Sequence, residues 1–599
     1  MDDNNNRNLF LATALSFVVI LVWFILFPPP EAPAPAEPAA VETTMQAPAT
    51  TASPEATAAA DSASAVAAAP RVKVDSAALT GSISLMGARF DDLSLKGYKV
   101  TQDPGSDIVR VLTPAGEAGA YYALHGWIPA GLPADAVPGA MTEWQLVKGD
   151  TLSPGKPVTL EWQNGQGLTF SREIAVDEKY LFTVTDTVTN TGTTAASLAP
   201  YAQVARHGTP ADLQNFFVLH EGVVGRTDGK LVEIDYDDVA GLPALEGAQG
   251  EKTDAATDGW IGFTDKYWMA TLVPPQGQPF SAVTKYIPGA DIYQTETRQA
   301  VLTVAPGASA AVTQQLFAGA KEWETIRGYQ TAGIPGFLDS IDWGWFFFLT
   351  KPIFAVLHWL NKLIGNMGLA IIGLTFVLKL IVLPLAYKSY VSMARMKELQ
   401  PEMEALKERA GDDKAKLQKE IMQLYKEKKV NPAAGCLPIL IQIPIFFSLY
   451  KVIFVTLELR HAPFFGWLQD LSAPDPSSIF NLFGALPWAA PTPGTLMATI
   501  FIGVLPILLG ISMWLQQKLN PAPADAAQAA IFAWMPWVFM FMLGSFASGL
   551  VVYWITNNVI TFVQQYTIMR SHGHKPDIFG NIRAGFKRKA AAPPVKGKK

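Results

Sequence analysis

One cysteine, Cys436, is present among the 599 residues, so a disulfide framework and a cysteine-based zinc site are both excluded. The sequence also lacks the GxSxG, HExxH and P-loop motifs and any glycine-rich dinucleotide turn. Cys436 stands at the entrance of an apolar run, where a free cysteine serves as a small apolar side chain. His125, His207 and His220 are scattered between predicted strands, which favours surface or hydrogen-bonded core positions over ligand roles. We therefore expect neither an enzyme nor a bound metal or cofactor.

Negative and positive charge are separated along the chain, although the formal net charge is only −6. Residues 28–344 carry 19 Lys and Arg against 37 Asp and Glu, a net of −18, so the remainder of the chain is +12. Positive charge concentrates in residues 388–430, with 11 basic and 8 acidic side chains, and in residues 570–599, with 9 and 1. Because basic segments beside membrane spans stay on the cytoplasmic side, the acidic half is expected on the opposite side of the membrane.

Long apolar runs indicate an integral membrane protein. Residues 9–27 form one uncharged run, and about 20 apolar residues are what a hydrocarbon core of roughly 30 Å requires. This run exceeds the roughly 7–15 apolar residues of a cleavable signal, so residues 1–27 are expected to be an anchor, with cleavage near an Ala-Pro-Ala at position 33 as the alternative. Five further spans are expected within residues 363–570, at about 364–387, 436–457, 495–516, 529–546 and 550–569. Six spans place both termini and residues 388–430 on the same side of the membrane, and their basic charge makes that side the cytoplasmic one.

Residues 71–325 have the pattern of a β domain. Short Thr- and Val-rich runs such as SREIAVDEKYLFTVTDTVTN alternate apolar and polar residues and end at turn signals. Repeated alternation with a period of two predicts antiparallel strands and a large all-β sandwich. The preceding residues 28–70 are rich in Ala and Pro and are expected to form an extended linker, because such a composition cannot bury a core.

Residues 337–362 are expected to be an amphipathic helix lying in the membrane interface. Lys351, His358 and Lys362 follow at i, i+7 and i+11 on one helical face, while aromatic and aliphatic residues crowd the rest. Pro352 is expected to kink the helix. The alternative is a seventh span, which the cost of a charge such as Lys351 in mid-membrane disfavours.

Residues 388–430 show the clearest soluble helical pattern in the chain. Apolar residues recur at spacings of three and four on both sides of a break at Gly411-Asp412-Asp413, which predicts two short helices packed as an antiparallel hairpin. A solvated charged linker is the alternative, but both arms carry a regular seam. The seam residues are Met396, Leu399, Met403, Leu406, Leu417, Ile421 and Leu424.

Lys379 stands near the middle of an apolar span, with about eight apolar residues between it and Lys388. Eight helical residues rise about 12 Å, farther than a lysine side chain snorkels, and a mid-membrane lysine costs at least about 2.5–3.5 kcal/mol. The ammonium group should therefore face a wet cavity or a partner. Thr375 lies one turn earlier, and Gln442 in another span also needs hydrogen-bond partners that lipid does not supply. A buried ion pair for Lys379 and a helix–helix hydrogen bond for Gln442 are the alternatives.

The stretch from 366 to 570 closely resembles the core of the bacterial YidC-type membrane protein insertases, relatives of the mitochondrial Oxa and chloroplast Alb proteins. The matching text is LPLAYKSYVSMARMKELQPEMEALKE, LYKEKKVNPAAGCLPILIQIPIFFSLY, LELRHAPF and FASGLVVYWITNN. The anchor, the acidic β domain and the interfacial helix extend the resemblance to Gram-negative members with a large periplasmic domain. That domain resembles the mutarotase-like sugar-binding sandwiches, which by itself implies no sugar activity.

The resemblance implies a five-helix core around a hydrophilic groove that is open to the cytoplasm and to lipid and closed toward the periplasm. The groove cation of the family, usually arginine, falls at Lys379, and polar groove positions fall at Thr375 and Gln442. An aromatic pair that is often Tyr-Tyr reads Tyr553-Trp554 here, which weakens any need for a second tyrosine hydroxyl. A turn usually written with proline reads FASG at 546–549.

The function implied by the resemblance is to insert, fold and help assemble inner-membrane proteins, alone or with the Sec translocon. The implied partners are nascent membrane-protein clients, the translocon with its accessory subunits, the translating ribosome and membrane lipid, but not DNA. Two roles stay open for the basic tail 571–599: binding ribosomal phosphates, or resting on anionic lipid as a topology signal.

Two other classes of function compete with insertion. A transporter or channel also needs polar residues at mid-membrane, but we find no inverted repeat and no pair of broken half-helices in the sequence. A periplasmic enzyme or receptor would place the function in residues 71–325, with the spans as an anchor. One span is enough for anchoring, so five polar-lined extra spans argue against that class.

Overall fold

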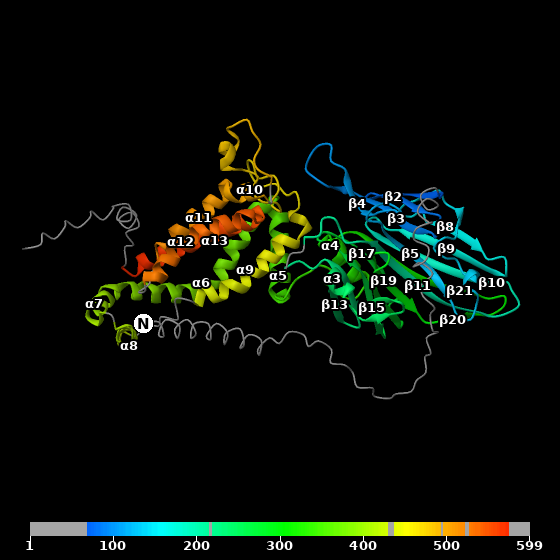
Figure 1. Cartoon of the computed structure of the whole chain (residues 1–599), viewed down its shortest axis with the longest axis horizontal. Helices are drawn as coiled ribbons and strands as arrows, with labels where there is room; N and C mark the ends of the chain where they lie inside the picture. Colours follow the sequence, from blue (N-terminus) through cyan, green and yellow to red (C-terminus); the bar gives the residue numbers. More distant parts are fainter. Residues whose placement is uncertain are drawn as a thin grey trace, which may run out of the picture. The chain divides into compact units, whose positions relative to one another are not determined.

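The computed structural model describes residues 69–214, 218–411, 413–428, 430, 437–492, 495–520 and 526–573. The predicted anchor (1–27), nearly all of the linker (28–70), Cys436 and the tail from residue 574 lie outside the described residues. The strands fall between Arg71 and Ala320, and the chain is mainly helical from Trp323 onward (Figure 1).

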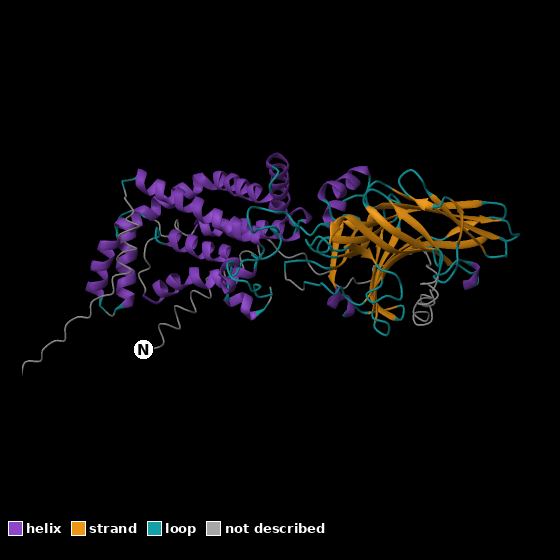
Figure 2. Cartoon of the chain, turned by 90° about the horizontal axis from the view of Figure 1, so that it is seen from above, coloured by secondary structure: helices purple, strands orange, loops and turns teal. Residues whose placement is uncertain are grey.

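The β region consists of two large sheets, which Figure 2 shows as stacked layers of strands. The first sheet contains, in spatial order, β14 (Ala244–Leu245), β15 (Ala248–Ala255), β18 (Phe280–Ile287), β19 (Ile292–Gln299), β11 (Ala196–His207), β5 (Tyr121–Pro129), β3 (Arg89–Lys99), β2 (Leu79–Ser84), β1 (Arg71–Asp75) and β7 (Thr151–Leu152), with β20 (Leu302–Val304) beside β11 and β4 (Ile108–Leu112) beside β3. The second contains β13 (Lys230–Asp235), β12 (Gly222–Thr227), β16 (Gly259–Thr264), β17 (Trp268–Val273), β21 (Ser309–Ala320), β10 (Leu181–Asn190), β9 (Leu168–Val176), β8 (Val158–Gln163) and β6 (Gln145–Lys148). Two short helices, η2 (Ala134–Ala136) and α3 (Tyr236–Ala240), lie in the connections.

Strand β10 shows why these residues form a sandwich. Its sequence LFTVTDTVTN alternates along its whole length between partly exposed and buried residues, and it pairs antiparallel with β9 and β21. Phe182 on its buried face meets Phe90 of the other sheet edge to face, with ring centroids 5.2 Å apart. The all-β domain predicted for this region is thus confirmed.

Buried polar groups also lie between the sheets. Arg172 and Asp186 are fully buried and joined by hydrogen bonds of 2.6 and 3.1 Å, and Arg172 also donates to the His125 carbonyl oxygen at 2.8 Å. Neither ring nitrogen of His125 has a hydrogen-bond partner among the described residues, so the expectation of a hydrogen-bonded core histidine is wrong there. Burial, together with the neighbouring Arg172 charge, lowers the pKa of His125 well below its ordinary value, and the ring is neutral.

His207 and His220 have hydrogen-bond partners, as expected. His220 contacts Asp235 at 2.7 Å and the Val223 carbonyl oxygen at 2.8 Å, and His207 lies 3.4 Å from the Tyr122 hydroxyl.

The helical region follows the last strand. Its elements are α4 (Trp323–Ala332), η3 (Phe337–Ser340), α5 (Phe347–Ile364), α6 (Met367–Glu398), α7 (Gln400–Ala410), α8 (Lys414–Glu427), α9 (Leu437–Val455), η5 (Leu457–Leu459), η6 (Ile479–Gly484), α10 (Leu496–Ile500), α11 (Val504–Gln517), α12 (Ala526–Met542), η7 (Leu543–Ser545) and α13 (Ser548–Ser571). Among the described residues, α6 is the one helix long and apolar enough to cross a membrane by length and composition alone. The count of six spans stays a prediction.

The span expected at 495–516 is interrupted, since α10 ends at Ile500 and α11 begins at Val504. The residues before α10 explain the break, because they cap the start of α11. Ser477 Oγ accepts from the Val504 N–H at 2.9 Å, and Asp475 accepts from the Leu505 N–H at 2.8 Å. An unbroken helix through this segment would use these N–H groups within its own ladder.

The expected interfacial helix is shorter than the range 337–362. It begins at Phe347, after a separate 3-10 turn at Phe337–Ser340 and a left-handed Gly344. The predicted polar face is occupied by acid partners: Lys351 contacts Asp339 at 2.7 Å, and His358 contacts Glu458 at 2.5 Å and Glu324 at 3.2 Å. Lys362 also pairs with Glu324. Large apolar side chains are exposed elsewhere on and beside this helix: Trp345, Phe347, Phe348, Trp359 and Leu363.

The first arm of the hairpin at 388–430 is not the separate short helix that was expected. Its first part is the end of α6, which runs to Glu398, and α7 forms the rest. Leu399 and Leu424 are buried together with Val430, and Met396, Met403 and Leu406 pack against them. Leu417 and Ile421 are only half-buried and lie outside this cluster. The seam therefore closes at the open end of the hairpin, away from the turn at Gly411.

We predict that Glu246 stabilises the β region above acid pH. The Arg298 guanidinium donates two hydrogen bonds of 2.8 Å to this carboxylate and Lys285 donates one of 2.6 Å, which lowers the pKa of Glu246 to about 2. A depressed carboxyl pKa contributes stability that is present above the ordinary value near 4.5 and is lost as the pH falls toward 2. Glu246→Gln should lower the melting temperature of the β region at pH 7 by about 2–4 °C.

Thermal unfolding at pH 7 and pH 3 checks this, with Glu178→Gln in the exposed turn before β10 as the control. The difference between the Glu246→Gln variant and the parent should shrink on acidification. A difference that is the same at both pH values would contradict the assignment.

Candidate functional site

Lys379, Gln442, Tyr553 and Thr561 meet inside the helical region and are called the polar cluster below. Lys379 on α6 donates from Nζ to the Thr561 hydroxyl at 2.9 Å and to Gln442 Oε1 at 3.3 Å. Gln442 on α9 donates from Nε2 to the Tyr553 hydroxyl at 2.7 Å. One chain of hydrogen bonds therefore joins α6, α9 and α13.

Close packing of α13 against α6 brings these groups within reach. Gly549 near the start of α13 leaves no space for a side chain, because an added Cβ would lie 2.9 Å from Leu459 and 3.3 Å from Ile371 of α6. Tyr553 and Thr561 then lie about two turns apart on one side of α13. Both are buried, at 2% and 5% exposure.

Two of the predicted site residues lie outside the polar cluster. Thr375 is buried, but its hydroxyl donates to the Ile371 carbonyl oxygen of its own helix at 2.7 Å. Trp554 packs on Phe446 and Phe539, with ring centroids 4.7 and 6.2 Å apart. It therefore belongs to an apolar contact between α9, α12 and α13.

Among the residues that the structure describes, no opposite charge lies beside Lys379. The side chain is 9% exposed, and within the described part of the chain no carboxylate lies at ion-pair distance from Nζ. A buried ammonium group without a carboxylate is costly, and hydrogen bonds to neutral oxygens compensate only part of that cost. The structure thus shows the cation and its neutral acceptors, and not the buried ion pair considered as the alternative.

Sequence reasoning missed Thr561, although it provides the shorter hydrogen bond to Lys379. Its signal is weak, because a lone threonine in an apolar helix usually bonds to its own backbone, and Thr561 also donates to the Asn557 carbonyl oxygen at 2.6 Å. Two further polar contacts join α13 to its neighbours: Asn558 donates to the Ser512 hydroxyl at 3.0 Å, and Gln565 donates to Asn520 at 3.2 Å. The last helix is therefore polar along most of its packed face.

Two family models and several full-length relatives match this chain. Residues 71–356 match the family described as the YidC periplasmic domain, and residues 359–575 match the 60Kd inner membrane protein family. A membrane protein insertase YidC of Cereibacter sphaeroides is 69% identical over 607 residues, which cover 99% of this chain and 97% of that protein. The chain belongs to the YidC family of membrane protein insertases. The YidC of Ruegeria pomeroyi is 63% identical over 605 residues, covering 98% of this chain and 99% of that protein.

Two solved structures are also similar. A crystal structure of an active YidC insertase, with its first transmembrane domain resolved, is 19% identical and covers 83% of this chain and 92% of its own, at a TM-score of 0.35. A galactose mutarotase-like protein from Lactobacillus casei is 13% identical and covers 42% of this chain and 100% of its own, at a TM-score of 0.27. The family resemblance drawn from residues 366–570 is confirmed by the full-length YidC relatives.

We predict that the Tyr553 hydroxyl stabilises the helical region through Gln442. Tyr553→Phe removes the acceptor and leaves a buried amide N–H without a partner, which should lower the free energy of unfolding by about 1–3 kcal/mol. Thermal unfolding in lipid nanodiscs measures the loss. Tyr566→Phe on the same helix is the matched control and should have little effect, because Tyr566 is only half-buried. Equal melting temperatures for the Tyr553→Phe variant and the parent would show that the hydrogen bond does not form in the membrane.

Proposed function

We propose that this chain inserts and folds inner-membrane proteins through a hydrophilic groove whose cation is Lys379. The observation that carries the proposal is the polar cluster, in which a lysine inside an apolar helix has only neutral partners among the described residues. The high identity to proteins named as membrane protein insertases over nearly the full length supports it.

Lys379 attracts clients because its ammonium group can exchange a neutral hydrogen-bond acceptor for a carboxylate of the client. A carboxylate in a translocating segment can replace Gln442 Oε1 or the Thr561 hydroxyl as the acceptor for Nζ. The resting acceptors are neutral, whereas a client carboxylate adds the attraction between opposite charges, about 4 kcal/mol at about 4 Å for an effective dielectric constant of about 20. Lys379 therefore binds an acidic client segment in preference to its resting partners and releases it without a chemical step.

Insertion by this route needs no nucleotide. The apolar stretch of the client moves into lipid, which releases roughly 25 cal/mol per Å² of apolar surface. The membrane potential contributes about 2.3 kcal/mol per charge for each 100 mV. The groove only has to reduce the distance through hydrocarbon that the polar flanks of the client must cross.

The proposed topology places both termini and the hairpin 388–430 in the cytoplasm and the β region in the periplasm, with six spans. The groove opens to the cytoplasm and to lipid. The charge separation along the sequence and the match of residues 71–356 to a periplasmic domain family support this arrangement.

Further partners are proposed from charge and position. The hairpin meets the incoming chain or its delivery machinery, and the hairpin or the basic tail 571–599 contacts the translating ribosome. The Sec translocon and its accessory subunits share clients with this chain. DNA is not expected to bind.

We predict that the charge at position 379 decides which clients are inserted. Lys379→Arg should keep insertion, because either cation attracts a carboxylate. Lys379→Glu should reduce insertion of clients with acidic translocated tails by roughly tenfold, since one lost charge-assisted hydrogen bond contributes about 1.5–3 kcal/mol. Clients with neutral tails should be affected much less. Protease protection of translocated tails in inverted vesicles measures insertion of both classes of client. Full insertion of every client by the Lys379→Glu variant would refute the electrostatic part of the mechanism.

We also predict that the folded hairpin is required. Leu399→Asp with Leu406→Asp places two charges in the apolar cluster with Leu424, which should melt the hairpin and lower insertion while the other helices stay folded. Hydrogen exchange reports the melting. Met422→Asp, on the exposed side of α8, is the control and should leave exchange and insertion unchanged. Full insertion with a melted hairpin would count against this role.

A further inference from the structure

Lys451 is a second charge in an apolar helix, and insertion as proposed above does not use it. It lies near the end of α9, whose sequence LPILIQIPIFFSLYKVIFV contains no other charged residue. The side chain is 7% exposed. It donates to the Asp342 carboxylate and to the Val218 carbonyl oxygen.

Asp342 connects α9 with the β region. Its side chain is 9% exposed and accepts from the His220 N–H at 2.8 Å and from the Gly344 N–H at 3.1 Å, as well as from Lys451. His220 is in turn held by Asp235 at 2.7 Å. Gly344 lies so close to the lysine stem that an added Cβ would be 3.3 Å from Lys451 Cε. The ammonium group is therefore held from several sides.

Gln442 and Lys451 of α9 point in opposite directions. Gln442 and Lys451 are nine residues apart, which is about 2.5 turns and about 13.5 Å along the helix. Gln442 contacts the polar cluster on one side, and Lys451 contacts Asp342 on the other. Pro444, between them, removes one backbone hydrogen bond from the helix.

Apolar packing alone leaves α9 free to slide or rotate by small amounts. Its aromatic contacts include Phe446 on Trp554 and Tyr450 on Phe546, and both are tilted ring pairs. A buried polar pair is different, because its geometry is satisfied in one register only, and register is the best-attested role of such pairs. A slide of about one ångström would already break the 3.3 Å contact of Gln442 with Lys379.

We propose that Lys451, through its pair with Asp342, sets the register of α9 and so holds Gln442 against Lys379. Lys451 is a positioning residue for the polar cluster, and the β region and the segment before α5 provide its anchor. This inference rests on the proposed function of the polar cluster, but its direct readout is a distance between helices and not an activity.

The test uses spin labels on two exposed positions, Ile443 of α9 and Val563 of α13, in a full-length chain with Cys436 replaced by Ser. Lys451→Met combined with Asp342→Asn removes the pair and leaves neither member as an unpaired buried charge. The amide oxygen introduced at position 342 keeps one of the two N–H contacts, that of His220 on Oδ2 or that of Gly344 on Oδ1. The electron–electron distance distribution in nanodiscs should shift or broaden by about 2 Å or more, and client insertion should fall severalfold. Lys451→Arg should restore both values.

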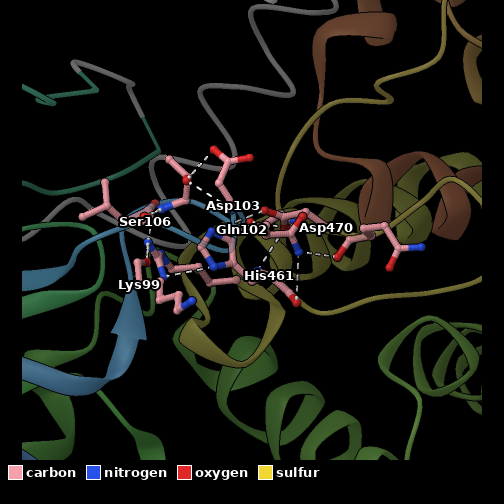
Figure 3. Close-up of polar contacts among 11 residues, drawn as sticks. Lys99, Gln102, Asp103, Ser106, His461 and Asp470 are labelled. Carbon is pink, nitrogen blue, oxygen red and sulfur yellow. Dashed lines mark hydrogen bonds and ion pairs between the residues drawn. The ribbon is translucent and has the colours of Figure 1, made fainter.

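Gln102→Ala is the matched control, because it breaks another contact between the β region and the helical region. Figure 3 shows Gln102 beside His461 and Asp470, and its amide donates to the Gln469 carbonyl oxygen at 2.7 Å in an exposed setting. This variant should leave the 443–563 distance unchanged. If the double variant does not fold, Asp342→Asn alone weakens the pair and should still broaden the distribution.

An unchanged 443–563 distance in the variants that lack the ion pair would overturn the positioning role. A changed distance with full insertion would overturn the link between register and the polar cluster. Failure of the proposed function appears elsewhere, as tolerance of Lys379→Glu by all clients, and leaves the distance result standing.

Discussion

The Lys379 ammonium group is held inside a helical bundle by two neutral oxygens, and the architecture around it follows from that constraint. A lone cation needs acceptors, so α9 and α13 each direct a polar side chain toward α6. Those acceptors need close helices, which Gly549 permits at the start of α13. These neutral acceptors compensate the buried charge only in part.

The surrounding elements fix the geometry of this site without sharing its chemistry. The polar face of α5 is tied to Glu324 and Glu458 through His358, and Lys451 ties α9 to Asp342. The hairpin is closed by Leu399, Leu424 and Val430 at its open end. The half-buried contact of His358 with Glu458 and the buried contact of Lys451 with Asp342 each join segments at least 100 residues apart in the sequence, so the positions of α5 and α9 depend on long-range packing.

The sequence predicted the features that depend on local pattern. Period-two alternation identified the two-sheet domain, as β10 illustrates, and the cost of a charge in an apolar run identified Lys379. It did not predict features set by tertiary contacts. The break before α11 depends on caps from Asp475 and Ser477, and Thr561 is recognisable only once α13 lies beside α6. The ring nitrogens of the buried His125 have no hydrogen-bond partner among the described residues, which no spacing in the sequence encodes.

If Lys379 lines the insertion route, a client passes directly beside it. Site-specific photocrosslinking during synthesis measures this contact. A photoreactive residue replaces Lys379, and a client with a neutral tail is used because its insertion does not depend on the cation. The same probe at Val563, an exposed position on α13, is the control. Adducts at position 379 that appear at defined nascent-chain lengths, and exceed those at 563, are the predicted result. Client adducts at 563 with none at 379 would contradict the account.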